Sequence, residues 1–377
     1  KNTMKGSSCC RAISSICRRN SKSQNACNYS TSTSTSTKRF ISSTSSLFNS
    51  LEQQQQQQFR RRNMSSSSSS SQSSSPSSPS SSTTSTSVSS QEVSKFSNMN
   101  SSWWNPTENP LIAMNPIRVQ YMLELLRSKG CLVEEGSSSS DISNSNYYSP
   151  PLKGKKALDV GCGGGLLSES LARLGANVTA IDPSIPLVNM AQHHAELDWR
   201  LSKHNKNNTT TTTESGGGGG GGLGTIDYRG GMSVEDLAHE YHNLDDTEKF
   251  DIVCILEVLE HVTDVDSLLQ AASSLLRPET GMLFVSTMNQ TLKSHAIAIV
   301  GAEYVMKYLP IGTHDWNKFL SPHEVETRMA RVGLQPVDTC GMVLKHPWSA
   351  PPISNWEWKL DRQDLDVNWI GGYQRLS

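Results

Sequence analysis

The feature that most constrains the fold is a glycine-rich turn between a buried strand and a helix. The string Leu158-Asp-Val-Gly-Cys-Gly-Gly-Gly165 follows an apolar segment that begins at Lys156 and precedes a helical pattern over 166–174. Glycines at such a turn permit positive φ angles and let the main chain approach a ligand without an intervening Cβ. The turn therefore predicts a strand–turn–helix unit with a ligand close to its backbone.

Strand and helix patterns alternate along the rest of the chain. Strands are predicted over 156–160, 178–181, 226–229, 250–256 and 282–287, and helices over 116–129, 166–174, 187–195 and 266–276. This alternation is typical of parallel βαβ units. Ligands in such sheets bind at the carboxyl ends of the strands, where all the motifs below lie.

Asp182 closes the second predicted strand, where a carboxylate can accept hydrogen bonds from both ribose hydroxyls of a nucleoside. The glycine spacing is G-x-G-x-G, formed by Gly161, Gly163 and Gly165, whereas a dinucleotide loop uses G-x-G-x-x-G. Asp159 would repel a pyrophosphate but can help orient the cationic methionyl end of S-adenosylmethionine. We therefore expect that methyl donor. A nicotinamide oxidoreductase and a tight turn without a ligand are the alternatives.

A second motif, Glu257-Val-Leu-Glu-His261, follows the fourth strand. If it opens a helical turn, Glu257, Glu260 and His261 share one face. Two carboxylates and an imidazole can hold Mg²⁺, which would stabilise a phenolate nucleophile. The alternatives are His261 as a general base without metal, and a solvated helix start whose acids complement the helix dipole.

A third segment, 293–310, follows the fifth strand and is apolar between flanking lysines. It is too short to span a bilayer, but it could lie in a membrane interface and admit a lipid-like substrate. The alternative is an ordinary buried helix that covers the active site.

Charge divides the chain at about residue 99. Residues 1–99 carry twelve Lys or Arg and two Glu, a net charge of +10, which leaves 22 basic and 33 acidic residues, a net of −11, for the remainder. This balance excludes a basic catalytic domain that binds nucleic acid through its overall field. Residues 1–62 are rich in Arg and Ser and almost free of acids, which is typical of a mitochondrial transit peptide. A basic nucleic-acid tail is the alternative.

Polar low-complexity segments set the domain boundaries. The polar, low-complexity composition of residues 63–99 predicts a disordered linker. Apolar patterning then predicts one folded domain over 100–377. Within it, 136–148 and 202–224 predict surface-loop insertions. The eight cysteines have no CxxC spacing, so neither a disulfide framework nor a zinc site is expected, and no apolar run is long enough to span a membrane.

Several further strings point to one family. The sequence resembles the ubiquinone-biosynthesis O-methyltransferase family in its mitochondrial form through the glycine turn and the strings Trp103-Trp-Asn-Pro, Met114-Asn-Pro-Ile-Arg118, Glu257-Val-Leu-Glu-His-Val262, Lys293-Ser, Val300-Gly-Ala-Glu-Tyr304, Gly312-Thr-His-Asp-Trp-Asn-Lys-Phe319 and Asp366-Val-Asn368. The resemblance implies a class I S-adenosylmethionine-dependent methyltransferase fold. That fold is α/β and Rossmann-like, with a seven-stranded, mostly parallel sheet and helices on both faces.

The resemblance also implies the reaction and its setting. Methyl groups would pass from S-adenosylmethionine to hydroxyls of polyprenylated catechol and hydroquinone intermediates, namely 3,4-dihydroxy-5-polyprenylbenzoate and demethylubiquinol. The enzyme would lie peripherally on the matrix side of the mitochondrial inner membrane, within a multiprotein biosynthetic complex and without a nucleic-acid partner. A catalytically idle scaffold in such a complex is the alternative, against which the intact acids of the motifs argue.

Carried over by position, the resemblance places donor contacts at Arg118, Gly161, Asp182 and Leu256, to which the turn itself adds Asp159 and Gly163. It makes Glu257, Glu260 and His261 the expected Mg²⁺ ligands, with His261 and Glu257 as the catalytic residues. The segment 234–236 is the natural place for an adenine contact, although no single residue there is predicted to make it.

Overall fold

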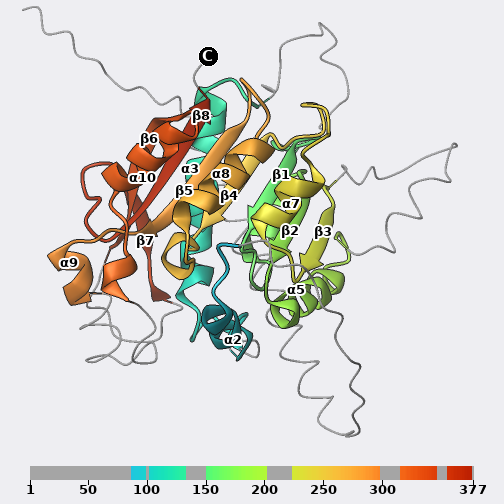
Figure 1. Ribbon diagram of the computed structural model, residues 1–377. Coiled ribbons are helices and arrows are strands. Elements are labelled where there is room, and N and C mark those ends of the chain that lie inside the picture. Colours follow the sequence, from blue (N-terminus) through green and yellow to red (C-terminus); the bar gives the residue numbers. More distant parts are fainter. Residues whose placement is uncertain are drawn as a thin grey trace, which may run out of the picture. The chain divides into compact units, whose positions relative to one another are not determined.

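An eight-stranded sheet organises the described part of the chain, in the strand order β3-β2-β1-β4-β5-β8-β6-β7 (Figure 1). The structure is a computed structural model that describes residues 86–98, 102–132, 150–201, 223–297, 315–345 and 355–375. All of these residues belong to the compact unit Ser45–Ser377.

Five neighbouring strands run parallel, namely β1 (Lys156–Val160), β2 (Asn177–Asp182), β3 (Ile226–Gly230), β4 (Ile252–Leu256) and β5 (Met282–Met288). The last residue of β1, Val160, lies between Ile181 of β2 and Ile255 of β4. The carboxyl ends of these three strands therefore meet at one edge of the sheet, and the strand order reverses between β1 and β4. This edge is the expected position for a ligand.

The other three strands form an antiparallel extension. β8 (Asn368–Arg375) pairs antiparallel with β5 and with β6 (Leu334–Leu344), and β7 (Trp358–Asp361) adds to the outer side of β6. The predicted α/β architecture with a mostly parallel sheet is therefore confirmed. The described sheet carries one strand more than the expected seven, and β7 lies at its edge.

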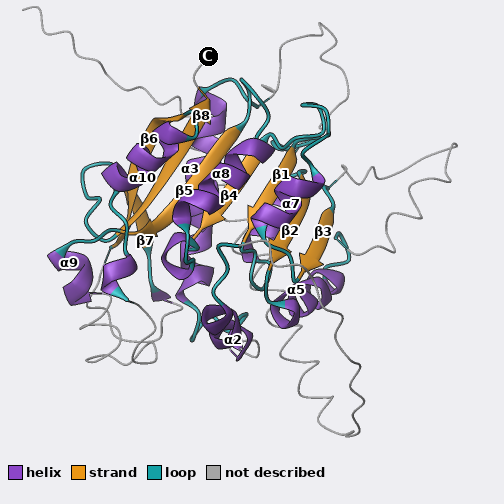
Figure 2. Ribbon diagram, in the orientation of Figure 1, coloured by secondary structure: helices purple, strands orange, loops and turns teal. Residues whose placement is uncertain are grey.

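Helices cover both faces of the sheet, as expected (Figure 2). One apolar core includes residues of α3 (Pro110–Ser128), α4 (Leu166–Arg173) and α5 (Ile185–Leu197), and the other includes residues of α7 (Val234–Glu240), α8 (Val265–Leu275) and α10 (Pro322–Arg331). Successive strand residues point to opposite faces. Ala157 accordingly joins the first core and Leu158 the second.

Most predicted boundaries differ from the structure by only one or two residues, but α3 begins six residues before the predicted Pro116. Asn109 caps this helix by accepting a hydrogen bond from the Leu111 N–H, and Pro110 occupies the first turn. Proline is favoured at the start of a helix, so either proline could have marked it. The earlier one does, and Pro116 lies inside the helix.

The predicted disordered linker 63–99 is wrong for its last part. Residues 90–98 form helix α2 (Ser90–Asn98), and the described chain before it begins at residue 86. The helix has Glu92 in its first turn and Lys95 in its last, the arrangement that complements the helix dipole. The described part of the chain therefore includes a helix on the amino-terminal side of the predicted boundary at residue 100.

Several other predictions fall outside the described residues. These are the transit peptide 1–62, the insertion 136–148, almost all of the insertion 202–224, and most of the apolar segment 293–310. The structure describes α9 (Leu292–Ser294) at the start of that segment and, elsewhere in the chain, two 3₁₀ turns, η2 (Leu259–His261) and η4 (Trp316–Lys318). None of the helices in the described ranges is long and apolar enough to cross a bilayer.

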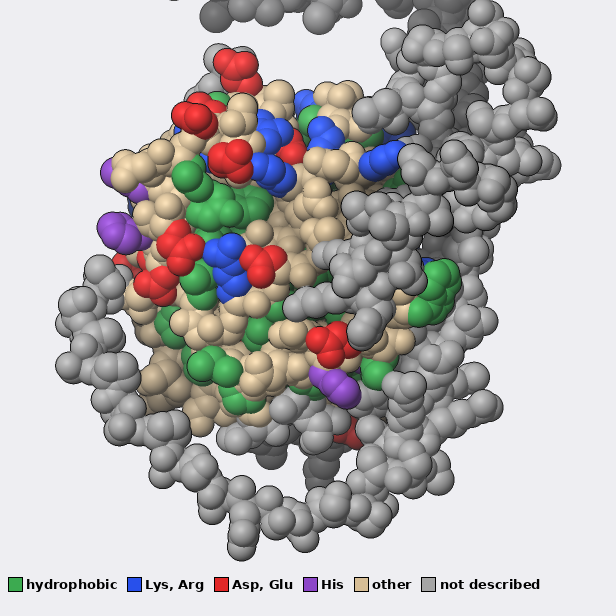
Figure 3. Space-filling model, turned by 90° about the vertical axis from the view of Figure 1, so that its right-hand side faces the viewer, with side chains coloured by type: hydrophobic (Ala, Val, Ile, Leu, Met, Phe, Trp, Pro, Cys, Tyr) green, Lys and Arg blue, Asp and Glu red, His purple; other side chains and the backbone are tan. Residues whose placement is uncertain are grey.

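The surface mixes charges of both signs on the face that Figure 3 shows. Exposed ion pairs join Arg229 to Asp227 at 2.8 Å and Lys345 to Glu357 at 2.9 Å. The four described cysteines are free thiols (Cys131, Cys162, Cys254 and Cys340).

The central strand β5 supplies a test of the core. Leu283 is fully buried, whereas Leu292 is 85% exposed. We expect Leu283→Ala to lower the free energy of unfolding by about 2–5 kcal/mol, because it removes buried methyl groups and leaves a cavity. The matched change Leu292→Ala should alter it by less than about 0.5 kcal/mol. Urea unfolding followed by tryptophan fluorescence measures both, and equal losses would contradict the assigned core.

Candidate functional site

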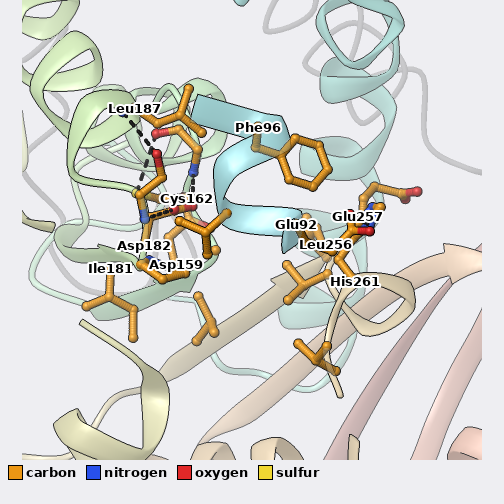
Figure 4. Close-up of a pocket in the computed structure, with 18 of the residues that line it drawn as sticks. Glu92, Phe96, Asp159, Cys162, Ile181, Asp182, Leu187, Leu256, Glu257 and His261 are labelled. Carbon is orange, nitrogen blue, oxygen red and sulfur yellow. Dashed lines mark hydrogen bonds and ion pairs between the residues drawn. The ribbon is translucent and has the colours of Figure 1, made fainter. Parts of the chain in front are cut away.

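A cavity of about 250 Å³ lies at the carboxyl ends of β1, β2 and β4. Its walls include the glycine turn, the segment after β4 and helices α2 and α3 (Figure 4). Every residue predicted to bind the donor, hold a metal or act in catalysis lines it: Arg118, Asp159, Gly161, Gly163, Asp182, Leu256, Glu257, Glu260 and His261. The residues predicted to form a site therefore lie together around one cavity.

The glycine turn depends on its lack of side chains. Gly161 and Gly163 have φ angles of 70° and 53°, in the left-handed region that favours glycine. A Cβ on Gly163 would lie 2.3 Å from Cζ2 of Trp103, because the indole ring packs directly against the turn. The neighbouring Trp104 donates its indole N–H to the Gly164 carbonyl at 3.0 Å. The Trp103-Trp104 pair thus packs on and anchors the turn.

Asp182 connects the end of β2 to this turn. Its Oδ2 accepts the Gly163 N–H at 2.9 Å, and its Oδ1 accepts the Ser184 N–H at 2.8 Å. Burial raises the pKa of Asp182, and these two N–H groups oppose the increase. The carboxylate is held in a fixed position beside the cavity. A group that accepts hydrogen bonds from ribose hydroxyls, as predicted for Asp182, needs such a position.

Asp159 lies at the end of β1 and is buried. Burial raises its pKa to about 6, although the Ser168 hydroxyl donates a hydrogen bond to its Oδ2 at 2.6 Å. The negative charge of Asp182 raises the pKa further, and the positive charge of Arg118 lowers it. A cation placed in the cavity would stabilise the ionised form of Asp159.

Glu257 has an unusual backbone. Its φ angle is 56°, a left-handed conformation that costs a residue with a side chain of order 1–3 kcal/mol. Its Oε1 forms an ion pair with Arg118 Nη2 at 2.9 Å and accepts the Ser286 hydroxyl at 2.6 Å. Backbone strain of this kind is common at functional sites and turns Glu257 towards the cavity.

Glu260 is buried beneath the site. Burial raises its pKa to about 8, and the negative charge of Glu257 adds to the increase. Its Oε2 accepts the Thr287 hydroxyl at 2.8 Å. This carboxyl group is therefore oriented towards β5.

His261 is oriented by residues of α2. Its Nδ1 lies 3.0 Å from Oε2 of Glu92, and its ring meets the Phe96 ring edge-on with centroids 4.8 Å apart. Figure 4 shows Glu92 and Phe96 on the side of the cavity that holds His261 and Glu257, away from Asp182.

The predicted metal site is not formed by these side chains. Glu257 is paired with Arg118, Glu260 with Thr287 and His261 with Glu92, so the three groups serve three different partners. Across the described ranges, no group of three or more His, Cys, Asp or Glu side chains is arranged to hold a metal ion. The prediction assumed one helical face, but the segment combines a left-handed Glu257 with the short 3₁₀ turn η2.

Helix α2 contributes to the site although its sequence did not predict it. Ser87, Glu92 and Phe96 line the cavity, as does Glu235, whose Oε1 accepts the Ser87 N–H at 3.2 Å. Val234 and Glu235 of the segment suggested for an adenine contact line the cavity, whereas Asp236 forms a capping box with Ser233. The only sequence signal for α2 was the spacing of Val93 and Phe96 within a serine-rich segment.

Comparison with known proteins now places the chain. Residues 142–339 match the family described as a methyltransferase domain. The chain is 40% identical to the ubiquinone biosynthesis O-methyltransferase of Cereibacter sphaeroides over 287 residues, which cover 75% of this chain and 95% of that protein. It is 37% identical to the protein of the same name from Azorhizobium caulinodans over 286 residues, which cover 75% and 92%.

The chain belongs to the ubiquinone biosynthesis O-methyltransferase family. It is therefore an S-adenosylmethionine-dependent methyltransferase with the class I fold, and the family membership favours this donor over a nicotinamide dinucleotide. Among solved structures, it is similar to the magnesium protoporphyrin IX methyltransferase of Synechocystis with bound S-adenosylhomocysteine, at 19% identity and a TM-score of 0.39, over 69% of this chain and 82% of that one.

Asp182 provides a test of the donor site. We expect Asp182→Ala to raise the Kd for S-adenosylmethionine about tenfold to a hundredfold, because hydrogen bonds to a charged group contribute about 1.5–3 kcal/mol. Isothermal titration measures this. The control is Asp227→Ala, which removes an exposed carboxylate from the adjacent strand β3 and should leave the Kd unchanged. A folded Asp182→Ala protein with the wild-type Kd would contradict the assignment.

The raised pKa of Asp159 predicts that the stability of the protein depends on pH. The folded protein keeps the proton of this carboxyl group up to about pH 6, whereas an ordinary aspartate releases it near 3.8. The free energy of unfolding should therefore fall as the pH rises through this window, by about 1.4 kcal/mol per unit of pKa. We expect wild type to lose stability relative to Asp159→Asn over that range, and the difference to level off above it. Parallel stability curves would contradict this.

Proposed function

We propose that the protein transfers a methyl group from S-adenosylmethionine to a phenolic hydroxyl of polyprenylated catechol and hydroquinone intermediates of ubiquinone biosynthesis. The proposed acceptors are 3,4-dihydroxy-5-polyprenylbenzoate and demethylubiquinol. The observation that carries the proposal is the 40% identity to a ubiquinone biosynthesis O-methyltransferase over 95% of its length, combined with a cavity lined by every expected site residue.

The donor fits the charges of this cavity. Asp182, at the end of β2, is the proposed partner of the ribose hydroxyls, and Asp159 that of the cationic methionyl end. Arg118 is buried, lines the same cavity and carries the charge that a donor carboxylate requires. The glycine turn at Gly161 and Gly163 and the side chain of Leu256 line the same cavity and would complete the donor pocket.

The bound donor supplies a methyl group on a positively charged sulfur. The chain must hold an acceptor oxygen in line with this group and remove its proton, which makes orientation and charge stabilisation the main contributions. We propose His261 as the general base: the phenolic proton passes to the imidazole, an oxygen–carbon bond forms and the sulfur–carbon bond breaks. Glu257, held by Arg118 and Ser286, borders the acceptor side of the cavity.

Magnesium is proposed from the family resemblance alone. In the arrangement described above, Glu257 would have to leave Arg118 and His261 would have to leave Glu92 before the three side chains could share an ion. The proposed general-base step therefore uses no metal ion.

The proposed location is the matrix side of the mitochondrial inner membrane, with the protein peripherally bound inside a multiprotein biosynthetic complex. The composition of residues 1–62 supports import, and the apolar segment 293–310 supports contact with a membrane interface. Leu292, 85% exposed at the start of α9, adds an apolar side chain next to that segment. A lipid-soluble acceptor would reach the enzyme most directly from such a surface.

The test is an assay of the purified 377-residue chain with a prenylated dihydroxybenzoate and methyl-labelled S-adenosylmethionine. We expect label on a phenolic oxygen of the product, identified by mass spectrometry. His261→Ala should reduce kcat by about 10²–10⁴-fold, the usual contribution of a positioned base. An acceptor with both hydroxyls already methylated is the control and should take up no label. Donor binding without transfer to the prenylated catechol would contradict the proposed function.

Removal of divalent ions with a chelator distinguishes the two possible roles of His261, as a general base and as a metal ligand. Activity that survives complete removal of divalent ions supports the general base, whereas activity that disappears and returns on addition of Mg²⁺ supports the metal ligand. Methyl transfer itself is compatible with both results.

A further inference from the structure

Helix α2 is attached to the catalytic side of the domain at both of its ends. Before the helix, the Ser87 carbonyl accepts hydrogen bonds from the N–H and the hydroxyl of Thr263, at 2.8 and 2.9 Å. Near its carboxyl end, the Ser97 hydroxyl lies 2.7 Å from the Ser184 hydroxyl, two residues after Asp182. The helix thus extends from the segment after His261 to the end of β2.

Between these two attachments, α2 presents two side chains to His261. Glu92 Oε2 lies 3.0 Å from the ring nitrogen Nδ1, and Phe96 packs edge-on against the ring. The side chains of Glu92 and His261 are 22% and 19% exposed, so their contact is largely sheltered from water. Lys95 lies 3.9 Å from the same Glu92 oxygen, on the next turn of the helix.

We propose that Glu92 is the positioning residue of His261, an inference that rests on the proposed function. A carboxylate that accepts the Nδ1–H fixes the tautomer of an imidazole, so that the basic lone pair is on Nε2. It also stabilises the imidazolium that forms when the ring takes a proton. Glu92 therefore acts on the reaction through His261 and does not touch the reacting atoms.

A purely structural role for Glu92 makes a different prediction. The hydrogen bonds of Ser87 and Ser97 hold α2 without using the Glu92 carboxylate. Loss of the Glu92 charge should therefore leave the helix docked while His261 loses its orienting partner. Hydrogen exchange of the α2 amides measures docking independently of activity.

The experiment uses the full chain with a prenylated dihydroxybenzoate and labelled S-adenosylmethionine at one fixed pH. We expect Glu92→Gln to lower kcat about tenfold to a hundredfold, the usual effect of removing a partner that orients a histidine. The KM for the acceptor and the Kd for the donor should stay within about twofold, and α2 exchange should be unchanged. Glu92→Asp, which keeps the charge, should recover part of the lost kcat.

Two comparisons make the result specific. Glu196→Gln makes the same chemical change on the exposed surface of α5 and should keep the wild-type kcat. In the His261→Ala background, Glu92→Gln should have no further effect on kcat, because residues that act through one another are not additive. Equal losses from Glu92→Gln in the wild-type and His261→Ala backgrounds would overturn the proposal.

The outcomes also separate this inference from the proposed function. An active wild type that depends on His261, together with a Glu92→Gln variant of unchanged kcat, overturns the positioning role alone. A loss of kcat accompanied by fast exchange throughout α2 also overturns it and makes Glu92 a docking residue. A wild type that binds the donor but methylates no prenylated catechol overturns the proposed function first.

Discussion

The hydrogen bond from the Gly163 N–H to Asp182 is the interaction on which the rest of the site depends. It joins the turn after β1 to the end of β2, and it forms only because these strands are parallel neighbours whose carboxyl ends coincide. The left-handed conformation of the turn favours glycine, and Trp103 packs where a side chain on Gly163 would otherwise lie. Strand order, glycine spacing and one carboxylate thus form a single constraint.

The buried acids give the cavity its chemical character. Burial raises the pKa values of Asp159, Asp182 and Glu260. Ionising these carboxyl groups around one small cavity therefore costs free energy. Arg118 offsets part of that charge through its ion pair with Glu257. A ligand with a positive sulfur and an ammonium group would compensate more of it, which gives an electrostatic reason for a cationic donor to bind here.

The sequence was most informative where local physics decides the outcome. The strands that end at Val160 and Asp182 are short apolar runs, which indicate buried strands without knowledge of their neighbours. Their positions, and those of the acids beside them, could therefore be predicted. The relation between Glu257 and His261 was not predictable, because it depends on the left-handed backbone conformation of Glu257. Helix α2 was also missed, since a nine-residue helix in a serine-rich segment owes its stability to tertiary contacts rather than to propensity.

The position of α2 limits how much can be removed from the amino terminus. If residues 1–62 are an import signal, the mature chain must still begin before Ser87, whose main chain bonds Thr263 and Glu235. A shorter product starting where the strongly apolar patterning begins would keep the whole sheet and the donor turn. It would lack Glu92 and leave one wall of the cavity open to solvent. The tolerated amino-terminal boundary and the surroundings of His261 are thereby linked in one short stretch of sequence.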